Sequence, residues 1–171
     1  MAMSDYIRNL RDKVGAELLL LPVVGAIVRN EDGQVLLQRR SDNGQWGIPG
    51  GIIDPGEAPA QTVVREILEE TGLVVRPQRL IGVFGGEDAR FIYPNGHQVE
   101  PTILLFECEV VAGHLSCDDG ESLELQFFHP HAITKLSGFN NTHFARLLDT
   151  PFQWDEQWLD KNELSSNPKR T

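Results

Sequence analysis

One predicted helix restricts the fold of this 171-residue chain more than any other feature. From Ala58 or Pro59 to Thr71, apolar residues recur at helical spacing and predict a face packed on a core: Ala60, Val63, Val64, Ile67 and Leu68. A different side of the same helix carries three carboxylates at i, i+3 and i+4, those of Glu66, Glu69 and Glu70. Like charges so spaced destabilise a helix by roughly 0.2–0.5 kcal/mol per pair, so this side needs a compensating charge.

A divalent cation is the simplest source of that charge. Mg²⁺ prefers carboxylate oxygens in octahedral geometry and keeps water ligands that a phosphate can replace. Gly50 and Gly51 precede the helix and allow close backbone approach, so the Gly50 carbonyl could add a neutral ligand. Glu57, at the junction of loop and helix, can reach the same ion. Arg65 is placed to pair with Glu57 or Glu69 and hold a carboxylate in position.

The rest of the chain predicts strands on both sides of this helix. A helix from Asp5 to Val14 is expected behind a Ser4 cap, and a second one includes Thr142–Leu148. Strands are expected at 22–29, 34–39, 79–84, 90–93, 102–111 and 123–128, the first two joined as a hairpin. Without strict βαβ alternation, this order favours an α+β or mixed α/β sandwich.

Composition excludes several functions. The net charge is −10 and the 15 Lys and Arg residues are scattered, which argues against a nucleic-acid polymer as partner. Cys108 and Cys117 form no CxxC pair and are interpreted as a reduced core cysteine and a loop cysteine. The longest apolar run, 18–28, is too short to span a bilayer, and no signal peptide is visible. A cytoplasmic protein is therefore expected.

The segment Gly51–Leu73 resembles the box of the Nudix hydrolases, G-x5-E-x7-R-E-U-x-E-E-x-G-U, where U is a bulky aliphatic residue. Every specified position is met, by Gly51, Glu57, Arg65, Glu66, Ile67, Glu69, Glu70, Gly72 and Leu73. The preceding WGIPG, residues 46–50, is also similar to the family's approach to the box. The resemblance covers about residues 18–135, and its specific part is the box.

The resemblance implies a Nudix-type α/β/α sandwich with a mixed sheet at residues 17–150, after a helical extension at 1–16 and before a polar tail at 151–171. It implies a hydrolase that depends on Mg²⁺, with Mn²⁺ as a substitute, and cleaves a diphosphate linkage in a nucleoside diphosphate joined to another moiety. By position, the metal ligands are Glu66, Glu69 and Glu70, with Glu57 and the Gly50 carbonyl in addition. Arg65 and Gly51 have orienting roles.

The general base and the substrate contacts are less defined. In the family either a box glutamate, here Glu69 or Glu70, or a later glutamate serves as base, and the later candidates are Glu121, placed first, and Glu124. Trp46 could stack on a base, although packing under the glycine-rich loop is favoured, and Arg40 could contact a phosphate. The markers that accompany ADP-ribose or diadenosine-polyphosphate hydrolysis are not met, so the substrate stays open.

Two other functions remain possible on this fold. A diphosphate isomerase needs an active-site cysteine, which Cys108 and Cys117 are poorly placed to supply. A nucleotide-sensing domain without catalysis usually lacks box glutamates, and this chain keeps them all. A homodimer is conceivable, since the first helix has an apolar face that one small domain need not bury.

Overall fold

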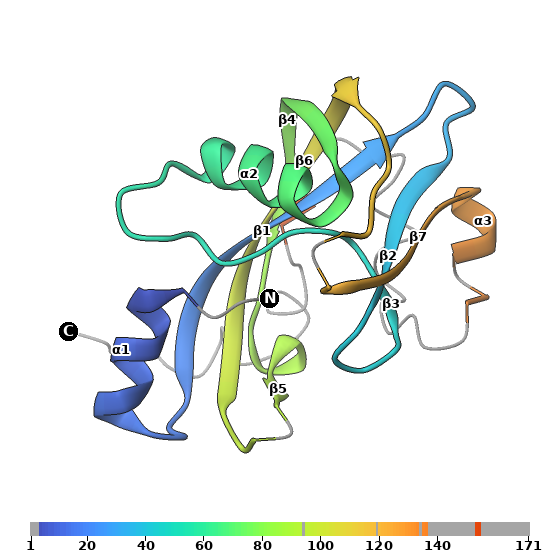
Figure 1. Cartoon of the computed structure of the whole chain (residues 1–171). Helices are drawn as coiled ribbons and strands as arrows, with labels where there is room; N and C mark the ends of the chain where they lie inside the picture. Colours follow the sequence, from blue (N-terminus) through green and yellow to red (C-terminus); the bar gives the residue numbers. More distant parts are fainter. Residues whose placement is uncertain (1–3, 94, 119, 134, 137–152, 155–171) are drawn as a thin grey trace, which may run out of the picture.

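The structure is a computed structural model and describes residues 4–93, 95–118, 120–133, 135–136 and 153–154 (Figure 1). Its helices are α1 (Asp5–Val14), α2 (Pro59–Thr71) and α3 (Pro130–Ile133), with a 3-10 turn, η1, at Glu87–Ala89. Its strands are β1 (Leu19–Arg29), β2 (Val35–Arg40), β3 (Trp46–Gly47), β4 (Leu73–Phe84), β5 (Phe91–Ile92), β6 (Gln98–Gly113), β7 (Ser122–Phe128) and β8 (Gln153–Trp154).

The described strands form one mixed sheet in the order β3-β2-β1-β6-β4-β8, with β5 on β6 and β7 on β2. The two long central strands, β1 and β6, run parallel, from Leu19 beside Val99 to Arg29 beside Glu109. On its other side β6 pairs antiparallel with β4. The predicted mixed sheet is confirmed.

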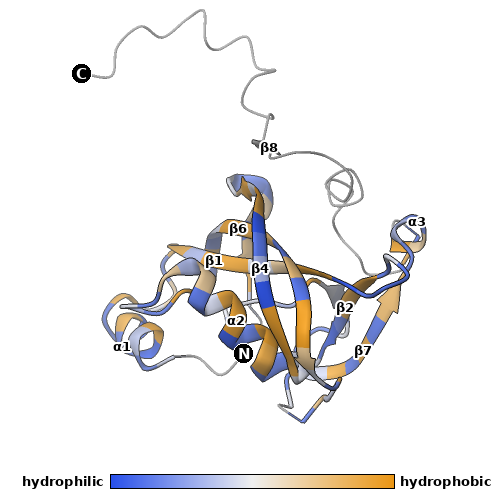
Figure 2. Cartoon of the chain, turned by 90° about the horizontal axis from the view of Figure 1, so that it is seen from above, coloured by the Kyte–Doolittle hydropathy of each residue, from blue (hydrophilic) through white to orange (hydrophobic). Residues whose placement is uncertain are grey.

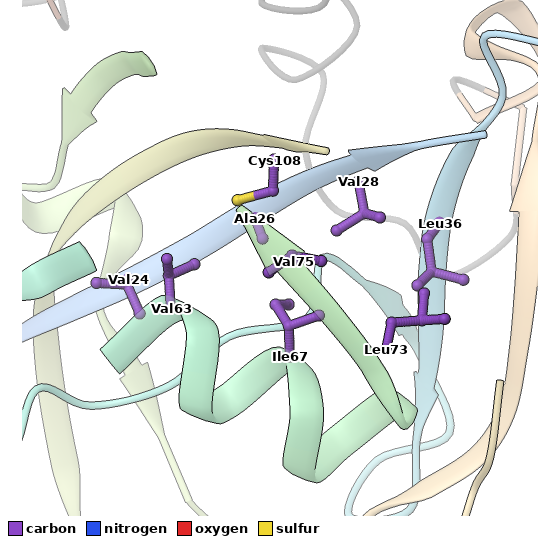
Figure 3. Close-up of a cluster of buried hydrophobic side chains, with 9 residues drawn as sticks. All are labelled: Val24, Ala26, Val28, Leu36, Val63, Ile67, Leu73, Val75 and Cys108. Atoms are coloured by element: carbon purple, nitrogen blue, oxygen red, sulfur yellow. The ribbon is translucent and has the colours of Figure 1, made fainter. Parts of the chain in front are cut away.

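Both faces of the central strands are buried. In β1 the residues from Val24 to Val28 are buried without interruption, as expected of a strand covered on two sides. On one face, side chains of β1, β2, β4 and β6 meet Val63 and Ile67 of α2 (Figure 3). Cys108 lies in this cluster, and Cys117 is exposed, so the interpretation of both thiols as free is confirmed.

The opposite face is built on Ile27, Leu105 and Ile81, which pack with Ile133 of α3. Helices therefore contribute to both sides of the sheet, and the predicted α/β/α sandwich is confirmed. α1 and α3 lie at opposite ends of the sheet (Figures 1 and 2). Ile7 of α1 packs on Leu21 and Val99, where β1 and β6 begin.

The predicted elements agree with the structure wherever they fall on described residues. The helix behind Ser4 has the expected bounds, and the Ser4 side chain accepts from the Ile7 N–H. The strand expected at 79–84 is the second half of β4, and the strand expected at 102–111 is the centre of β6. Both are longer than expected because strand pairing extends them beyond the apolar runs. The helix expected at Thr142–Leu148 and most of the tail at 151–171 lie outside the described residues.

The loop before α2 runs along the edge of β1. Val24 N–H donates to the Gly51 carbonyl at 2.8 Å, and Ala26 N–H donates to the Pro49 carbonyl at 3.0 Å. This pairing occupies the side of β1 that β2 leaves open, because the two strands are in register only at Arg29 and Val35. The loop is thereby fixed between the sheet and α2.

Candidate active site

α2 begins and ends where the sequence predicts. Pro59 occupies its first position, and the Gln61 side chain accepts from the Ala58 N–H at 2.9 Å. Gly72 ends the helix in the left-handed conformation, with φ of 72°, and donates to the Leu68 carbonyl. The helix therefore holds its carboxylates at a fixed place between loop and sheet.

The predicted apolar face of α2 is confirmed at Val63 and Ile67 and is wrong at Ala60 and Leu68. Glu66 and Glu70 are buried, 6% and 2% exposed, whereas Leu68 is 47% exposed and Ala60 is exposed as well. The reason is the loop at 49–53, which packs over the carboxylate side and removes it from solvent. Only Glu69 of the three carboxylates has most of its side chain in water.

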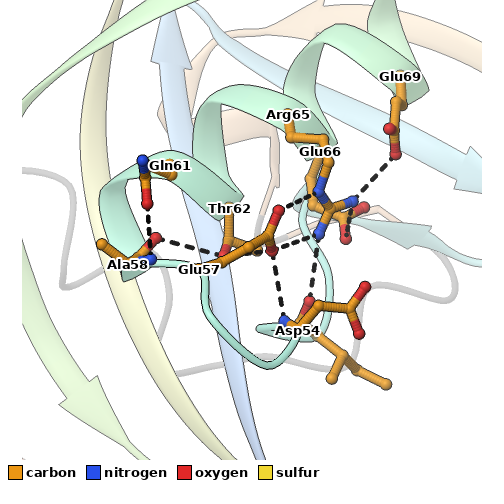
Figure 4. Close-up of polar contacts among 9 residues, drawn as sticks. Asp54, Glu57, Ala58, Gln61, Thr62, Arg65, Glu66 and Glu69 are labelled. Carbon is orange, nitrogen blue, oxygen red and sulfur yellow. Dashed lines mark hydrogen bonds and ion pairs between the residues drawn. The ribbon is translucent and has the colours of Figure 1, made fainter. Parts of the chain in front are cut away.

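Arg65 and Glu57 form the outer part of the site (Figure 4). The Arg65 guanidinium donates to both oxygens of Glu57, and the Thr62 hydroxyl adds a bond of 2.9 Å. Chiefly because of Arg65, the pKa of Glu57 falls to about 2. The remaining terminal nitrogen of Arg65 donates to Glu66 at 2.9 Å and to Glu69 at 3.1 Å. Both pairings expected of Arg65 are therefore present.

Glu66 and Glu70 form the inner part. Burial raises the pKa of Glu66, and the neighbouring Arg65 partly opposes this shift. Burial also raises the pKa of Glu70 to about 8, although the Gly50 N–H donates to its Oε2 at 2.8 Å. Two carboxyl groups in this environment resist ionisation until a cation compensates them.

Gly50 and Gly51 are required here by space. A Cβ at residue 51 would fall on the Glu66 carboxylate, and one at residue 50 would overlap the Val24 carbonyl. Gly50 also has φ of 150°, which side-chain-bearing residues rarely adopt. Residues 49 and 51 direct their carbonyls to β1, while residue 50 directs its N–H to Glu70.

Glu121 lies close enough to act on the inner carboxylates, since its charge raises the pKa of both Glu66 and Glu70. It directly precedes β7, and its carbonyl accepts from the Ser41 N–H at 2.8 Å. The structure therefore joins Glu57, Glu66 and Glu69 through Arg65 and places Glu70 and Glu121 within electrostatic range of Glu66.

The three residues considered as substrate contacts have different surroundings in the structure. Trp46 packs edge-on against Phe128, with ring centroids 4.9 Å apart, so its expected packing role is the one observed. Glu124 faces Arg39 across the β2–β7 pairing, with its Oε2 3.7 Å from the Arg39 Nε. Arg40 forms a two-bond pair with Asp42 and is near enough to Glu70 for that carboxylate to raise its pKa.

Sequence reasoning missed Gln38 and Ser122, two buried polar residues beside Glu70. The Gln38 amide donates to the Ser122 hydroxyl at 2.9 Å, and that hydroxyl donates to the Glu70 carbonyl at 3.2 Å. One signal was present in the sequence: Gln38 ends the apolar run VLL in a strand. Neither residue belongs to the box.

The donor set fits a hard divalent cation. In the described part of the chain, no three His, Cys, Asp or Glu side chains converge as a ready-made metal centre, and Arg65 bridges Glu57, Glu66 and Glu69. The buried oxygens of Glu66 and Glu70, whose pKa values are raised, are nonetheless the ligands that Mg²⁺ prefers.

Comparison with known proteins agrees with this arrangement. The NUDIX domain family model matches residues 19–148. An ADP-ribose pyrophosphatase of Methanocaldococcus jannaschii is 34% identical over 138 residues, which cover 78% of each chain. A MutT-like protein of Streptomyces ambofaciens is 30% identical over 86% of each chain. A solved UDP-X diphosphatase is 26% identical with a TM-score of 0.61, covering 84% of this chain and 68% of that one.

The chain belongs to the Nudix family of hydrolases. It is an enzyme of the pyrophosphohydrolase class, which acts on acid anhydride bonds between phosphates. Within the described residues, no helix is long and apolar enough to cross a membrane.

Proposed function

We propose that this enzyme cleaves the diphosphate linkage of a small nucleotide in which a nucleoside diphosphate is joined to another moiety, and that it depends on Mg²⁺ or Mn²⁺. The observation that carries the proposal is the pair Glu66 and Glu70, buried against a glycine loop with raised pKa values. Arg65 contacts Glu66 of this pair, but burying the Glu70 carboxyl group beside it remains unfavourable unless a further positive charge joins them.

Glu66, Glu69 and Glu70 would hold the metal, with Glu57 and the Gly50 carbonyl as further ligands. A bound divalent ion supplies charge neutralisation at the phosphate oxygens and acidifies a coordinated water. Arg65 supports this arrangement, because its contacts with Glu57, Glu66 and Glu69 fix three carboxylates at once. Gly50 N–H and Gln38 both favour the ionised form of Glu70.

A carboxylate near the inner pair would take the proton from the attacking water. Glu121 is our first candidate, because it lies outside α2 yet within electrostatic reach of Glu66 and Glu70. Glu69 and Glu70 are the alternatives within the box. Arg40 is a cation in reach of Glu70 and could meet a substrate phosphate after exchanging Asp42 for it.

The substrate class is inferred from two directions. Relatives named for ADP-ribose and UDP-X favour a small nucleotide diphosphate. The net charge of −10 disfavours a nucleic-acid polymer. The substrate is therefore a small nucleotide diphosphate.

The two other functions on this fold have less support. An isomerase would need an active-site thiol, but Cys108 is in the core under α2, where burial raises its pKa to about 12. A nucleotide-sensing domain would not need the complete set of carboxylates that this site assembles. Both are therefore set behind hydrolysis.

A substrate panel tests the proposal. Phosphate release after phosphatase coupling would be measured for ADP-ribose, NADH, nucleotide sugars, dinucleoside polyphosphates and (d)NTPs, with Mg²⁺ or with chelator. We expect metal-dependent turnover of at least one diphosphate, and its loss in Glu69→Gln and Glu70→Gln. Glu109→Gln, on an exposed ion pair with Arg76, is the matched control and should retain activity. No turnover of any compound, or full activity in the two α2 variants, would refute hydrolysis at this site.

A further inference from the structure

Gln38 is a polar residue whose side chain is buried away from solvent. It lies near the end of β2, directly after three fully buried apolar residues, and is only 2% exposed. Its amide donates to the Ser122 hydroxyl at 2.9 Å and lies near enough to the Glu70 carboxylate to favour its ionised form. A buried amide is retained only where its partners are well placed, so this position ties β2 to the helix.

Ser122 continues the same chain of bonds. Its hydroxyl accepts from Gln38, and it donates its one proton to the main-chain carbonyl of Glu70 at 3.2 Å. Glu70 is therefore held at its side chain and at its backbone: the Gly50 N–H donates to its carboxylate, with Gln38 close by, and Ser122 donates to its main-chain carbonyl. The three polar residues are all buried.

A β-bulge places Ser122 for this contact. Arg39 pairs with Glu124, but Arg40 pairs with Ser122, so β7 has one extra residue, Leu123, at this point. A bulge of this kind turns the bulged strand and redirects its side chains. The residue before Ser122 is Glu121, and its carbonyl is fixed by Ser41 N–H. The position of Glu121 therefore depends on the same junction that holds Glu70.

We propose that Gln38 and Ser122 are positioning residues that fix Glu70 in α2 and Glu121 before β7 at one mutual distance. Neither residue touches the reacting atoms in this role. The two glutamates come from different elements, and the Ser122 hydroxyl, which accepts from Gln38, joins those elements by donating to the Glu70 carbonyl. This inference rests on the proposed function for its catalytic consequence, but the positioning itself can be measured without substrate.

Four variants separate positioning from general stability. Gln38→Met keeps the length of the side chain and removes its amide, and Ser122→Ala removes the hydroxyl. Ser122→Thr keeps a hydroxyl and serves as the rescue variant. Leu37→Met is the matched control, because it changes the neighbouring buried residue, which packs on the opposite face of the sheet. Thermal unfolding of each variant identifies any that fail to fold.

Two readouts need no turnover. The first is the amide resonance of Gly50, which donates to Glu70, in the metal-free protein. The second is Mn²⁺ affinity, measured by the paramagnetic resonance signal of free Mn²⁺. We expect Gln38→Met and Ser122→Ala to shift the Gly50 resonance and to weaken Mn²⁺ binding by about tenfold, the common effect of losing a partner behind a metal ligand. Leu37→Met and Ser122→Thr should leave both unchanged.

The catalytic readout compares the change in kcat with the change in KM for a diphosphate that the wild type cleaves. Positioning of Glu70 and Glu121 predicts a fall in kcat of about tenfold in Gln38→Met, with KM little changed. A loss of thermal stability equal to that of Leu37→Met, with wild-type Gly50 resonance, Mn²⁺ affinity and kcat, would overturn the inference. A wild type that cleaves no diphosphate would refute the proposed function instead, and the two substrate-free readouts would still decide the positioning.

Discussion

Arg65 and Glu57 are joined by two parallel hydrogen bonds, from Nε to Oε1 at 2.7 Å and from Nη2 to Oε2 at 2.9 Å. This two-pronged geometry is the strongest that a carboxylate and a guanidinium can form. It fastens the loop before α2 to the second turn of the helix. Since the third nitrogen reaches Glu66 and Glu69, Arg65 also offsets the repulsion that the sequence predicts among the α2 carboxylates.

The Glu57–Arg65 pair predicts a stability that depends on acid. The pKa of Glu57 in the folded protein, about 2, is below its ordinary value of 4.5. The stabilisation is therefore complete above about pH 4.5 and is lost as pH falls toward 2. We expect wild type to exceed Glu57→Gln in free energy of unfolding at pH 6, by a margin that shrinks over that window. Urea unfolding at several pH values measures the margin.

A suitable comparison for that experiment is Glu109→Gln. Glu109 pairs with Arg76 on the exposed side of the sheet, and exposed pairs contribute little to stability. The difference in free energy of unfolding between wild type and Glu109→Gln should be small at every pH. A Glu57→Gln margin that stayed constant between pH 6 and 2 would contradict the assignment of this ion pair.

The contribution of Glu70 to stability should depend on pH in the opposite direction. Its pKa in the folded protein, about 8, exceeds its ordinary value of 4.5, so the folded state holds a proton that the unfolded state releases. Its contribution is complete below pH 4.5 and declines as pH rises through 8. With a chelator present, we expect Glu70→Gln to unfold at higher urea concentration than wild type at pH 8.5, and to show no such advantage at pH 4.

Addition of Mg²⁺ should reverse that order at pH 8.5. A ligand that binds only the folded state stabilises it, and the ionised carboxylate of the wild type is the better ligand. The same urea series with and without Mg²⁺ gives the result directly. If Mg²⁺ stabilised Glu70→Gln as strongly as wild type, Glu70 would not be a metal ligand.

Gly51 predicts a steric effect confined to the site. In Gly51→Ala the new methyl group falls on the Glu66 carboxylate, so this buried side chain must move from its place. We expect loss of metal-dependent turnover and of Mg²⁺ stabilisation. Gly47→Ala is the control, because a Cβ at residue 47 comes no nearer than 4.0 Å to the surrounding atoms. Equal turnover in the two variants would show that Glu66 moves aside without consequence.

Replacing Trp46 should change the stability of the protein without changing substrate binding. Its ring packs edge-on against Phe128 in the cluster on the face of the sheet opposite α2. Trp46→Phe removes part of that contact and should cost about 1–2 kcal/mol of unfolding free energy. KM for the cleaved diphosphate should stay at the wild-type value. A raised KM at unchanged Tm would instead identify Trp46 as a substrate contact.

Local rules predict α2 well and its environment poorly. Pro59, Gly72 and the helical spacing of Val63 and Ile67 define the helix from nearby residues alone, and the structure agrees. The burial of Glu66 and Glu70 depends on a loop pairing with β1, a contact between distant residues that periodicity in the helix does not contain. The same limit applies to Gln38, whose partners are up to 84 positions away.

The loop at 49–53 places the site largely through main-chain atoms. Its carbonyls at 49 and 51 are bound to β1, and its N–H at 50 is bound to Glu70. Two of its side chains, Ile52 and Ile53, also pack against buried hydrophobic clusters, so these positions must stay apolar while residues 50 and 51 must remain glycine. A library limited to apolar residues at Ile52 and Ile53 should yield many active clones, whereas one randomised at the two glycines should yield almost none. Tolerance to substitution in this loop is therefore set by what each position packs against: Ile52 and Ile53 should accept other apolar side chains, whereas Gly50 and Gly51 leave no space for a side chain.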